Sequence, residues 1–137
     1  MKVNLQDLEL ATDFVGSDSE AQAYLDTQTG YIYYVHDDLD EDVPEDISSE
    51  RYLQIPSNKD LQSERDMIFR FVRQELPDEF ERIDRYFSKR GAYANFRSRI
   101  EALGVLEQWY RFKNDITVQN LKAWCDDHSL NYDDPTA

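Results

Sequence analysis

The acidic run from residue 37 to residue 50 is the stretch of this chain with the most obvious capacity for chemistry. It holds eight carboxylates and no basic side chain. Oxygen ligands suit Ca²⁺, and the alternate spacing that opens a calcium-binding loop occurs in Asp38, Asp40 and Asp42. Val43 stands where that loop needs a glycine, and Ser49 stands where it needs a bidentate glutamate. The run therefore predicts an acidic surface and no metal site.

Other catalytic or metal-binding patterns are missing from the sequence. Neither His36 nor His128 has a metal-ligand spacing with Cys125. The chain has four glycines and contains no phosphate-binding glycine loop, nucleophile elbow or paired-histidine motif. Carboxylates exposed in a charge run make poor general acids at neutral pH. We therefore expect no enzymatic activity, no cofactor and no metal.

A second kind of chemistry is available between residues 82 and 113, where eight basic residues face three acidic ones. Arginine and lysine bind phosphates, and aromatic rings stack on bases. Internal pairing of these arginines with the acidic run is the competing interpretation. The spacing discriminates poorly between the two, since Arg97 and Arg99 are two positions apart on a helix and do not share a face. The alternative candidate site, for RNA or single-stranded nucleic acid, comprises Arg90, Tyr93, Arg97, Arg99, Arg111 and Lys113.

The overall charge of −14 argues against general binding to DNA, RNA or anionic membranes. The charge is uneven, since residues 1–80 carry 20 acidic and 6 basic side chains and residues 81–137 carry nine of each. One cysteine cannot form an internal disulfide, and no apolar run has the length of a signal peptide or membrane span. These features predict a cytoplasmic protein that does not enter a membrane.

The elements that must position these residues begin with a helix and a small sheet. Apolar residues at helical spacing predict an N-terminal helix that ends near Gly16. Segments 21–26 and 31–36 are rich in tyrosine and flank a short connection with a glycine, which is typical of a β-hairpin. Segment 51–56 predicts an edge strand that its proline terminates.

Helices are expected from residue 57 onward. Ser57 and Asp60 resemble a capping box, and the apolar spacing that follows predicts one helix ending near Glu75. Pro77 suits the first position of the next helix, and Gly91 follows its last turn. Because apolar periodicity stops before Gly91 and restarts after it, we expect Gly91 to be left-handed between two helices.

The remaining periodic segment starts after Gly104, a second candidate for a left-handed cap. Trp109 lies on an aromatic stripe that we expect to form the core. The spacing continues past Phe112 to Trp124, either in one long helix or in a new one capped near Asp115 or Thr117.

Together these elements predict an α+β fold that is predominantly helical. An N-terminal helix and a hairpin or three-stranded antiparallel sheet would pack on a C-terminal bundle of four to five helices. We expect one domain over residues 1–137, with helix and sheet in 1–56, helices in 57–130 and a frayed tail in 131–137.

A succession of short motifs runs through most of the chain: Arg51-Tyr52-Leu53 with Ile55-Pro56, Leu76-Pro77-Asp78, Arg90-Gly91-Ala92-Tyr93 with Phe96-Arg97, Trp109-Tyr110 with Phe112, and Trp124 before Ser129-Leu130. In these motifs the chain resembles a widespread bacterial family of small acidic uncharacterised proteins. The resemblance implies a bacterial, cytoplasmic protein and supplies no catalytic residue.

The function we expect is a non-enzymatic interaction with a basic protein partner, of the kind made by antitoxins, immunity proteins and nucleic-acid mimics. An acidic field accelerates the encounter with a basic partner, and tyrosine offers rigid contact area with a polar tip. Charge that merely maintains solubility is the competing interpretation. The candidate partner-binding residues are Tyr33, Asp37, Asp38, Asp40, Glu41, Asp42, Glu45 and Asp46.

Overall fold

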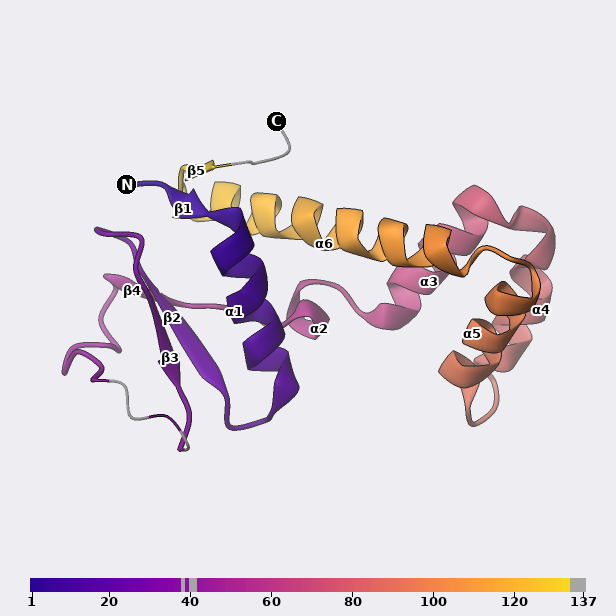
Figure 1. The fold of residues 1–137 in the computed structure, drawn as a ribbon, viewed down its shortest axis with the longest axis horizontal. Coiled ribbons are helices and arrows are strands. Elements are labelled where there is room, and N and C mark those ends of the chain that lie inside the picture. Colours follow the sequence, from indigo (N-terminus) through magenta and orange to yellow (C-terminus); the bar gives the residue numbers. More distant parts are fainter. Residues whose placement is uncertain (38, 40–41, 134–137) are drawn as a thin grey trace. The chain divides into compact units, whose positions relative to one another are not determined.

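The structure is a computed structural model that describes residues 1–37, 39 and 42–133 (Figure 1). Its elements are β1 (Val3–Asn4), α1 (Leu5–Ser17), β2 (Gln22–Asp26), β3 (Ile32–Val35), β4 (Tyr52–Gln54), α2 (Asn58–Leu61), α3 (Glu64–Glu75), the 3₁₀ turn η1 (Pro77–Glu79), α4 (Phe80–Tyr86), α5 (Ala92–Ala102), α6 (Leu106–Asp127) and β5 (Tyr132–Asp133). Six α-helices and a three-stranded antiparallel sheet among the described residues confirm the predicted α+β, mostly helical class.

The elements group into two compact units, which we describe separately. The sheet unit contains Met1–Gln62 and the chain from Thr117 onward, and the helical unit contains Ser63–Ile116. Helix α6 contributes residues to both. The expectation of a single domain over residues 1–137 stays a prediction.

The sheet unit is built on strands in the order β3-β2-β4, as the hairpin and edge-strand predictions required. Central β2 places Tyr24 opposite Tyr33 of β3 and Gln54 of β4. Because side chains alternate between faces, Ala23 and Leu25 point to one face, and α1 lies along it (Figure 1). The buried core of this unit consists of Val3, Leu5, Leu8, Ala11, Ala23, Leu25, Ile55, Leu121 and Cys125.

A second, parallel pair of strands joins the two ends of the described chain. Val3 in β1 lies opposite Tyr132 in β5, and the Val3 N–H donates to the Asn131 carbonyl at 2.8 Å. The frayed tail predicted from residue 131 is therefore wrong for residues 131–133, and residues 134–137 lie outside the described part. The local sequence is polar, and its partner strand is more than 120 residues away, so no nearby pattern signals the pairing.

The helix predicted from Ser57 to Glu75 is two helices. Ser57 and Asp60 form the expected capping box on α2, which is only one turn long. The chain becomes extended at Gln62, and the Ser63 side chain then accepts a hydrogen bond from the Asp66 N–H to cap α3. A second Ser-x-x-Asp pattern thus starts a new helix where the apolar spacing alone predicts continuity.

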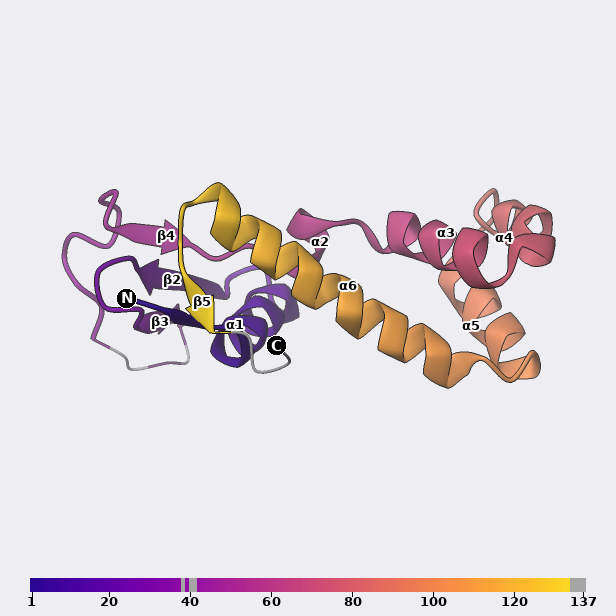
Figure 2. The ribbon, with the colours of Figure 1, turned by 90° about the horizontal axis from the view of Figure 1, so that it is seen from above.

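The helical unit consists of α3, α4, α5 and the first half of α6 (Figure 2), and aromatic side chains form much of its core. Its buried core is Met67, Ile68, Phe71, Val72, Ile83, Phe96, Ile100, Trp109 and Ile116. Trp109 is fully buried, which confirms the predicted aromatic core. Gly91 and Gly104 have φ of 75° and 73°, as predicted for left-handed glycines after helices.

The observed ends of α4 and α6 differ from the predicted helix boundaries in one case and decide between two alternatives in the other. Pro77 begins the 3₁₀ turn η1 instead of an α-helix, and α4 ends at Tyr86, with turns leading to Gly91. Helix α6 is unbroken from Leu106 to Asp127, so the long-helix alternative is correct.

Candidate binding surfaces

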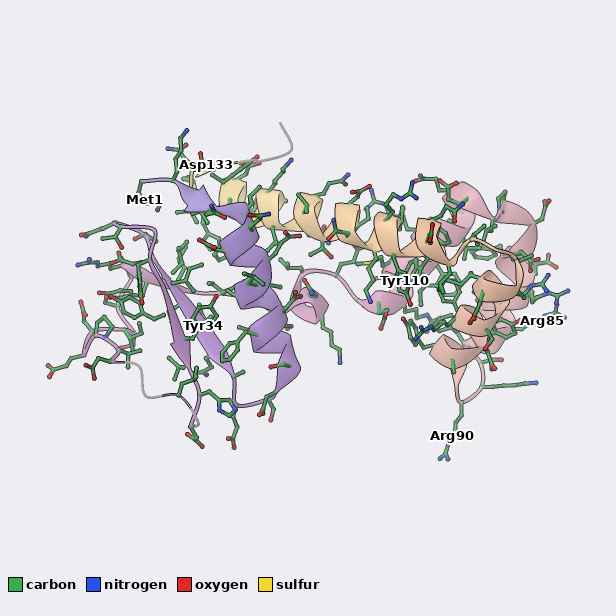
Figure 3. All side chains as sticks on the ribbon, in the orientation of Figure 1. Met1, Tyr34, Arg85, Arg90, Tyr110 and Asp133 are labelled. Carbon is green, nitrogen blue, oxygen red and sulfur yellow. The ribbon has the colours of Figure 1, made fainter. Side chains whose placement is uncertain are left out.

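The sheet face opposite α1 carries tyrosines from all three strands. We call Tyr24, Tyr31, Tyr33 and Tyr52 the tyrosine face. The Tyr33 ring lies edge-on to Tyr31 at 4.6 Å and to Tyr52 at 6.0 Å between ring centroids. Tyr31 is 54% exposed, whereas Tyr52 is buried. Tyr34 lies on the other face, in edge contact with Phe14 of α1 at 5.0 Å (Figure 3), so alternation separates the consecutive tyrosines.

Residues 37–50, which we call the acidic connection, join β3 to β4. The described carboxylates among the predicted partner-binding residues are all exposed: Asp37, Asp42, Glu45 and Asp46. The other three, Asp38, Asp40 and Glu41, lie outside the described residues. From Pro44 the chain forms consecutive turns, in which the Ser49 N–H donates to the Asp46 carbonyl at 2.8 Å and the Tyr52 N–H donates to the Ser49 carbonyl at 3.2 Å. These turns lead directly into β4, which begins at Tyr52.

One ion pair to a buried carboxylate fixes the end of the acidic connection to the sheet. The guanidinium of Arg51 donates from Nε and Nη2 to the two carboxylate oxygens of Asp26, at 3.0 and 2.8 Å. Asp26 is 2% exposed, and the Gln28 N–H also donates to it at 2.9 Å. The hydrogen bonds from Arg51 hold the pKa of Asp26 well below its usual value although burial acts in the opposite direction. The same guanidinium lies 5.3 Å from the Tyr52 ring, so it also supports the tyrosine face.

The six residues of the alternative nucleic-acid site do not share one environment. Arg99 donates to both carboxylate oxygens of Glu79, at 2.6 and 3.2 Å, and Lys113 pairs with Glu64 at 3.2 Å. The pairing with Glu79 lowers the pKa of that carboxyl. The other four, Arg90, Tyr93, Arg97 and Arg111, are exposed, and Arg90 extends away from the ribbon in Figure 3. Two of the five predicted cations therefore form ion pairs within the helical unit.

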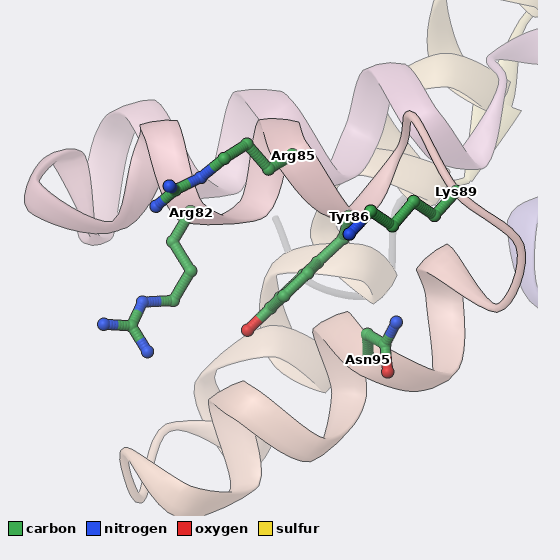
Figure 4. A pocket seen from close by; sticks show the side chains of 5 residues that line it. All are labelled: Arg82, Arg85, Tyr86, Lys89 and Asn95. Atoms are coloured by element: carbon green, nitrogen blue, oxygen red, sulfur yellow. The ribbon is translucent and has the colours of Figure 1, made fainter.

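A pocket that the sequence analysis missed lies on the helical unit. It has a volume of about 450 Å³ and is lined by Arg82, Arg85, Tyr86, Lys89 and Asn95 (Figure 4). A signal was available, because the first four of these residues recur at i, i+3, i+4 and i+7, which places them on one side of a helix.

The remaining chemically capable residues do not assemble a metal centre in the described part of the chain. No group of three or more His, Cys, Asp or Glu side chains is placed there to hold a metal ion. Cys125 is fully buried, and its pKa is raised to about 11 by burial and by the neighbouring Asp126. His36 Nε2 lies 2.9 Å from Asp18 Oδ2. The expected absence of enzymatic activity and of cofactors stays a prediction.

Charge is divided between the two units. By sequence, the sheet unit holds 19 acidic and 4 basic residues, for a net charge of −15, and the helical unit holds 10 acidic and 11 basic residues, for +1. The acidity of the protein therefore belongs to the unit that carries the tyrosine face. None of the described helices combines enough length and apolar character to cross a membrane.

The fold and these surfaces define a small, predominantly helical α+β protein with an acidic sheet unit and a helical unit that bears a basic pocket. The chain belongs to the Uncharacterised protein family (UPF0158), whose family model matches residues 2–133. This confirms the resemblance seen in the sequence as far as family membership is concerned. No curated protein and no solved structure matches the chain.

Proposed function

We propose that this protein is a non-enzymatic interaction protein of the bacterial cytoplasm, which binds a basic protein through its tyrosine face and acidic connection. Antitoxins, immunity proteins and nucleic-acid mimics are the kinds of protein that act in this way. The observation that carries the proposal is the presence of both features on one unit: the Tyr33 ring contacts the rings of Tyr31 and Tyr52, and the connection between β3 and β4 bears exposed carboxylates.

The composition of this surface suits a protein interface. Interface centres are rich in tyrosine and their rims are polar, and a few aromatic anchors supply most of the binding energy. Here the half-exposed Tyr31 is backed by Tyr33, so its ring is held in place before a partner arrives. Two apolar residues of the acidic connection, Leu39 and Val43, are also 45% and 39% exposed. A partner that covers the face would remove this apolar surface from water.

The carboxylates favour a basic partner. Within the described part of the chain, Asp37, Asp42 and Glu45 form no ion pair with a cation of their own unit. The unit's net charge of −15 would attract a positive surface and raise the association rate by roughly 10- to 1,000-fold at low salt. The same field would repel nucleic acids and acidic proteins, so it also provides specificity.

Affinity capture from the source cytoplasm after nuclease treatment tests the proposal, provided that it compares matched variants. The site variant combines Asp37→Asn, Asp42→Asn and Glu45→Gln. The control variant combines Glu20→Gln, Asp126→Asn and Asp127→Asn, three exposed carboxylates elsewhere on the sheet unit. Both variants change the net charge from −14 to −11. We expect the wild type and the control to retain one basic protein and the site variant to lose it.

Salt and Tyr31 provide independent checks on the same complex. Raising ionic strength shortens the reach of the field from about 10 Å at 0.1 M to about 3 Å at 1 M, so the association rate should fall steeply. Tyr31→Ala should weaken binding by about thirtyfold or more if Tyr31 is an anchor. If the captured protein persists at high salt and binds the site variant as well as the control, acidic recognition is eliminated.

A further inference from the structure

The pocket on the helical unit is a second candidate binding site, separate from the tyrosine face. Arg82, Arg85 and Tyr86 belong to α4, Lys89 follows that helix, and Asn95 lies on α5. Figure 4 shows the guanidinium groups of Arg82 and Arg85 extending toward the same side, with the Tyr86 ring reaching from α4 toward α5. The volume of about 450 Å³ lies in the range of small-molecule sites.

Backbone hydrogen bonds explain why Lys89 lines the pocket together with α4 residues although α4 ends at Tyr86. The Phe87, Ser88 and Lys89 N–H groups donate to carbonyls three residues earlier, at 3.1, 3.3 and 3.2 Å. This 3₁₀-type continuation keeps Lys89 near the side of Arg85 and Tyr86. Gly91, at φ 75°, then reverses the chain so that α5 brings Asn95 to the opposite wall.

The cations of this pocket are only partly paired with carboxylates in the described part of the chain. Glu79 binds Arg99 at 2.6 Å and also lies 3.4 Å from Arg82, so one carboxylate serves two arginines. Arg85 and Lys89 form no ion pair in the described part of the chain, and no acidic residue lines the pocket. Uncompensated cations in a concave site predict an anionic ligand.

We propose that this pocket binds a nucleoside phosphate, with Arg82, Arg85 and Lys89 holding the phosphate, Tyr86 stacking on the base and Asn95 contacting the base edge. The arginine fork matches phosphate oxygens, and lysine adds a mobile point charge. A half-buried aromatic ring next to cations is the usual platform for an unpaired base. The asparagine amide offers both a donor and an acceptor to a base edge.

The ligand could be a free nucleotide or one nucleotide of a single-stranded nucleic acid, because both offer a phosphate next to an accessible base. The site differs from the predicted alternative surface, since it uses none of Arg90, Tyr93, Arg97, Arg99, Arg111 or Lys113 as a lining residue. It also lies on a different unit from the tyrosine face, so the two sites can be tested separately in the full chain.

The probes are 5′-AMP, a single-stranded oligouridylate, inorganic phosphate and adenosine. The pocket variant is Arg85→Gln with Lys89→Gln, and the control is Arg70→Gln with Arg73→Gln, which removes two exposed arginines of the same unit outside the pocket. All four residues are exposed, so both variants should keep the wild-type circular dichroism. Amide and side-chain NMR shifts of the wild type locate the site without relying on any variant.

We expect AMP or the oligouridylate to shift signals of Tyr86 and Asn95, and the pocket variant to bind about tenfold or more weakly while the control stays within about twofold. Equal binding of AMP and oligouridylate, with full competition, identifies a free nucleotide. Tighter binding of the oligouridylate, with a salt slope about 1.4 shallower in the pocket variant, identifies a single strand. The proposal is overturned if the control loses as much affinity as the pocket variant, if inorganic phosphate competes as well as AMP, or if no probe shifts Tyr86 and Asn95.

Discussion

At the residue scale, hydrogen bonds from Arg51 keep the buried Asp26 carboxyl ionised by lowering its pKa. A carboxyl group whose pKa is lower in the folded state than in the unfolded chain contributes stability above the unfolded pKa, near 3.9, and loses it as pH falls toward the folded pKa. Asp26→Asn should therefore be less stable than the wild type at neutral pH. The difference should shrink below about pH 4, by up to about 1.4 kcal/mol per pH unit.

Urea unfolding at a series of pH values measures this difference in the free energy of unfolding. Glu20→Gln is a suitable control, because that carboxyl is exposed. A difference between wild type and Asp26→Asn that stays constant down to about pH 2 would show that the Arg51 pair does not lower the pKa of Asp26.

Trp109 tests the packing of the helical core. Its ring contacts Phe71 and Phe96 at centroid distances of 5.3 and 5.1 Å, and its side chain is fully buried. Trp109→Ala should lower the free energy of unfolding by about 3 to 5 kcal/mol. The indole N–H has no hydrogen-bond partner among the residues that the structure describes, so Trp109→Phe loses volume but no polar contact and should cost less than half as much. Denaturation followed by far-ultraviolet circular dichroism compares the two variants, and equal losses would contradict the packing we describe.

Cys125 provides a probe of local opening in the sheet unit. Burial and Asp126 raise the pKa of its thiol to about 11, and the thiolate is the reactive form. A thiol reagent at pH 8 should react with the folded protein at least about a hundredfold more slowly than with the urea-unfolded chain, from the pKa difference alone. Comparable rates would mean that Cys125 is accessible in the native protein.

At the element scale, the turn between α4 and α5 depends on one backbone conformation. Gly91 has φ 75°, and a Cβ built there would meet no atom within 4 Å. A substitution at Gly91 is therefore penalised by its backbone alone, without a steric clash. Gly91→Val should lower the free energy of unfolding by more than about 1 kcal/mol, and Gly91→Asn by less, because asparagine tolerates this region. Thermal unfolding of Gly91→Val and Gly91→Asn measures this difference. Equal unfolding midpoints for the two variants would show that the positive φ at this position does not limit stability.

The sequence predicts those elements whose ends are set by residues close to them in the chain. Gly91 and Gly104 interrupt apolar periodicity, and a left-handed glycine follows from that interruption wherever the chain folds. The break at Ser63 was also local and was missed, since the apolar spacing from Leu61 to Leu76 suggested continuity. The β1–β5 pair has no local cause, because its partners come from opposite ends of the chain.

The candidate sites also divide into features set by neighbouring residues and features set by contacts between distant elements. The tyrosine face could be predicted in part, since period-two alternation fixes which tyrosines of β2 and β3 share a side. The pairing of Arg99 with Glu79 could not, because it joins two elements 20 residues apart. That contact engages the Arg99 guanidinium within the helical unit, and only the fold reveals that Arg85 and Lys89 have no such partner among the described residues.

At the scale of the whole molecule, the separation of charge makes the two units respond differently to salt. Like charges in the sheet unit, at −15, repel one another in the folded state, whereas the helical unit, at +1, has little net repulsion to relieve. Raising the ionic strength shortens the range of that repulsion, so salt should stabilise the sheet unit more than the helical unit.

Hydrogen exchange measured at low and high sodium chloride can follow both units in one sample, which makes each unit the control for the other. We expect the amides of β2 (Gln22–Asp26) to become more protected as salt rises, with little change for α3 (Glu64–Glu75). The site variant with Asp37, Asp42 and Glu45 neutralised should show a smaller salt effect in β2, because part of the repulsion is already gone. Equal salt responses in β2 and α3 would mean that charge repulsion does not limit the stability of the sheet unit, and the acidic surface would then exert no measurable strain on its own fold.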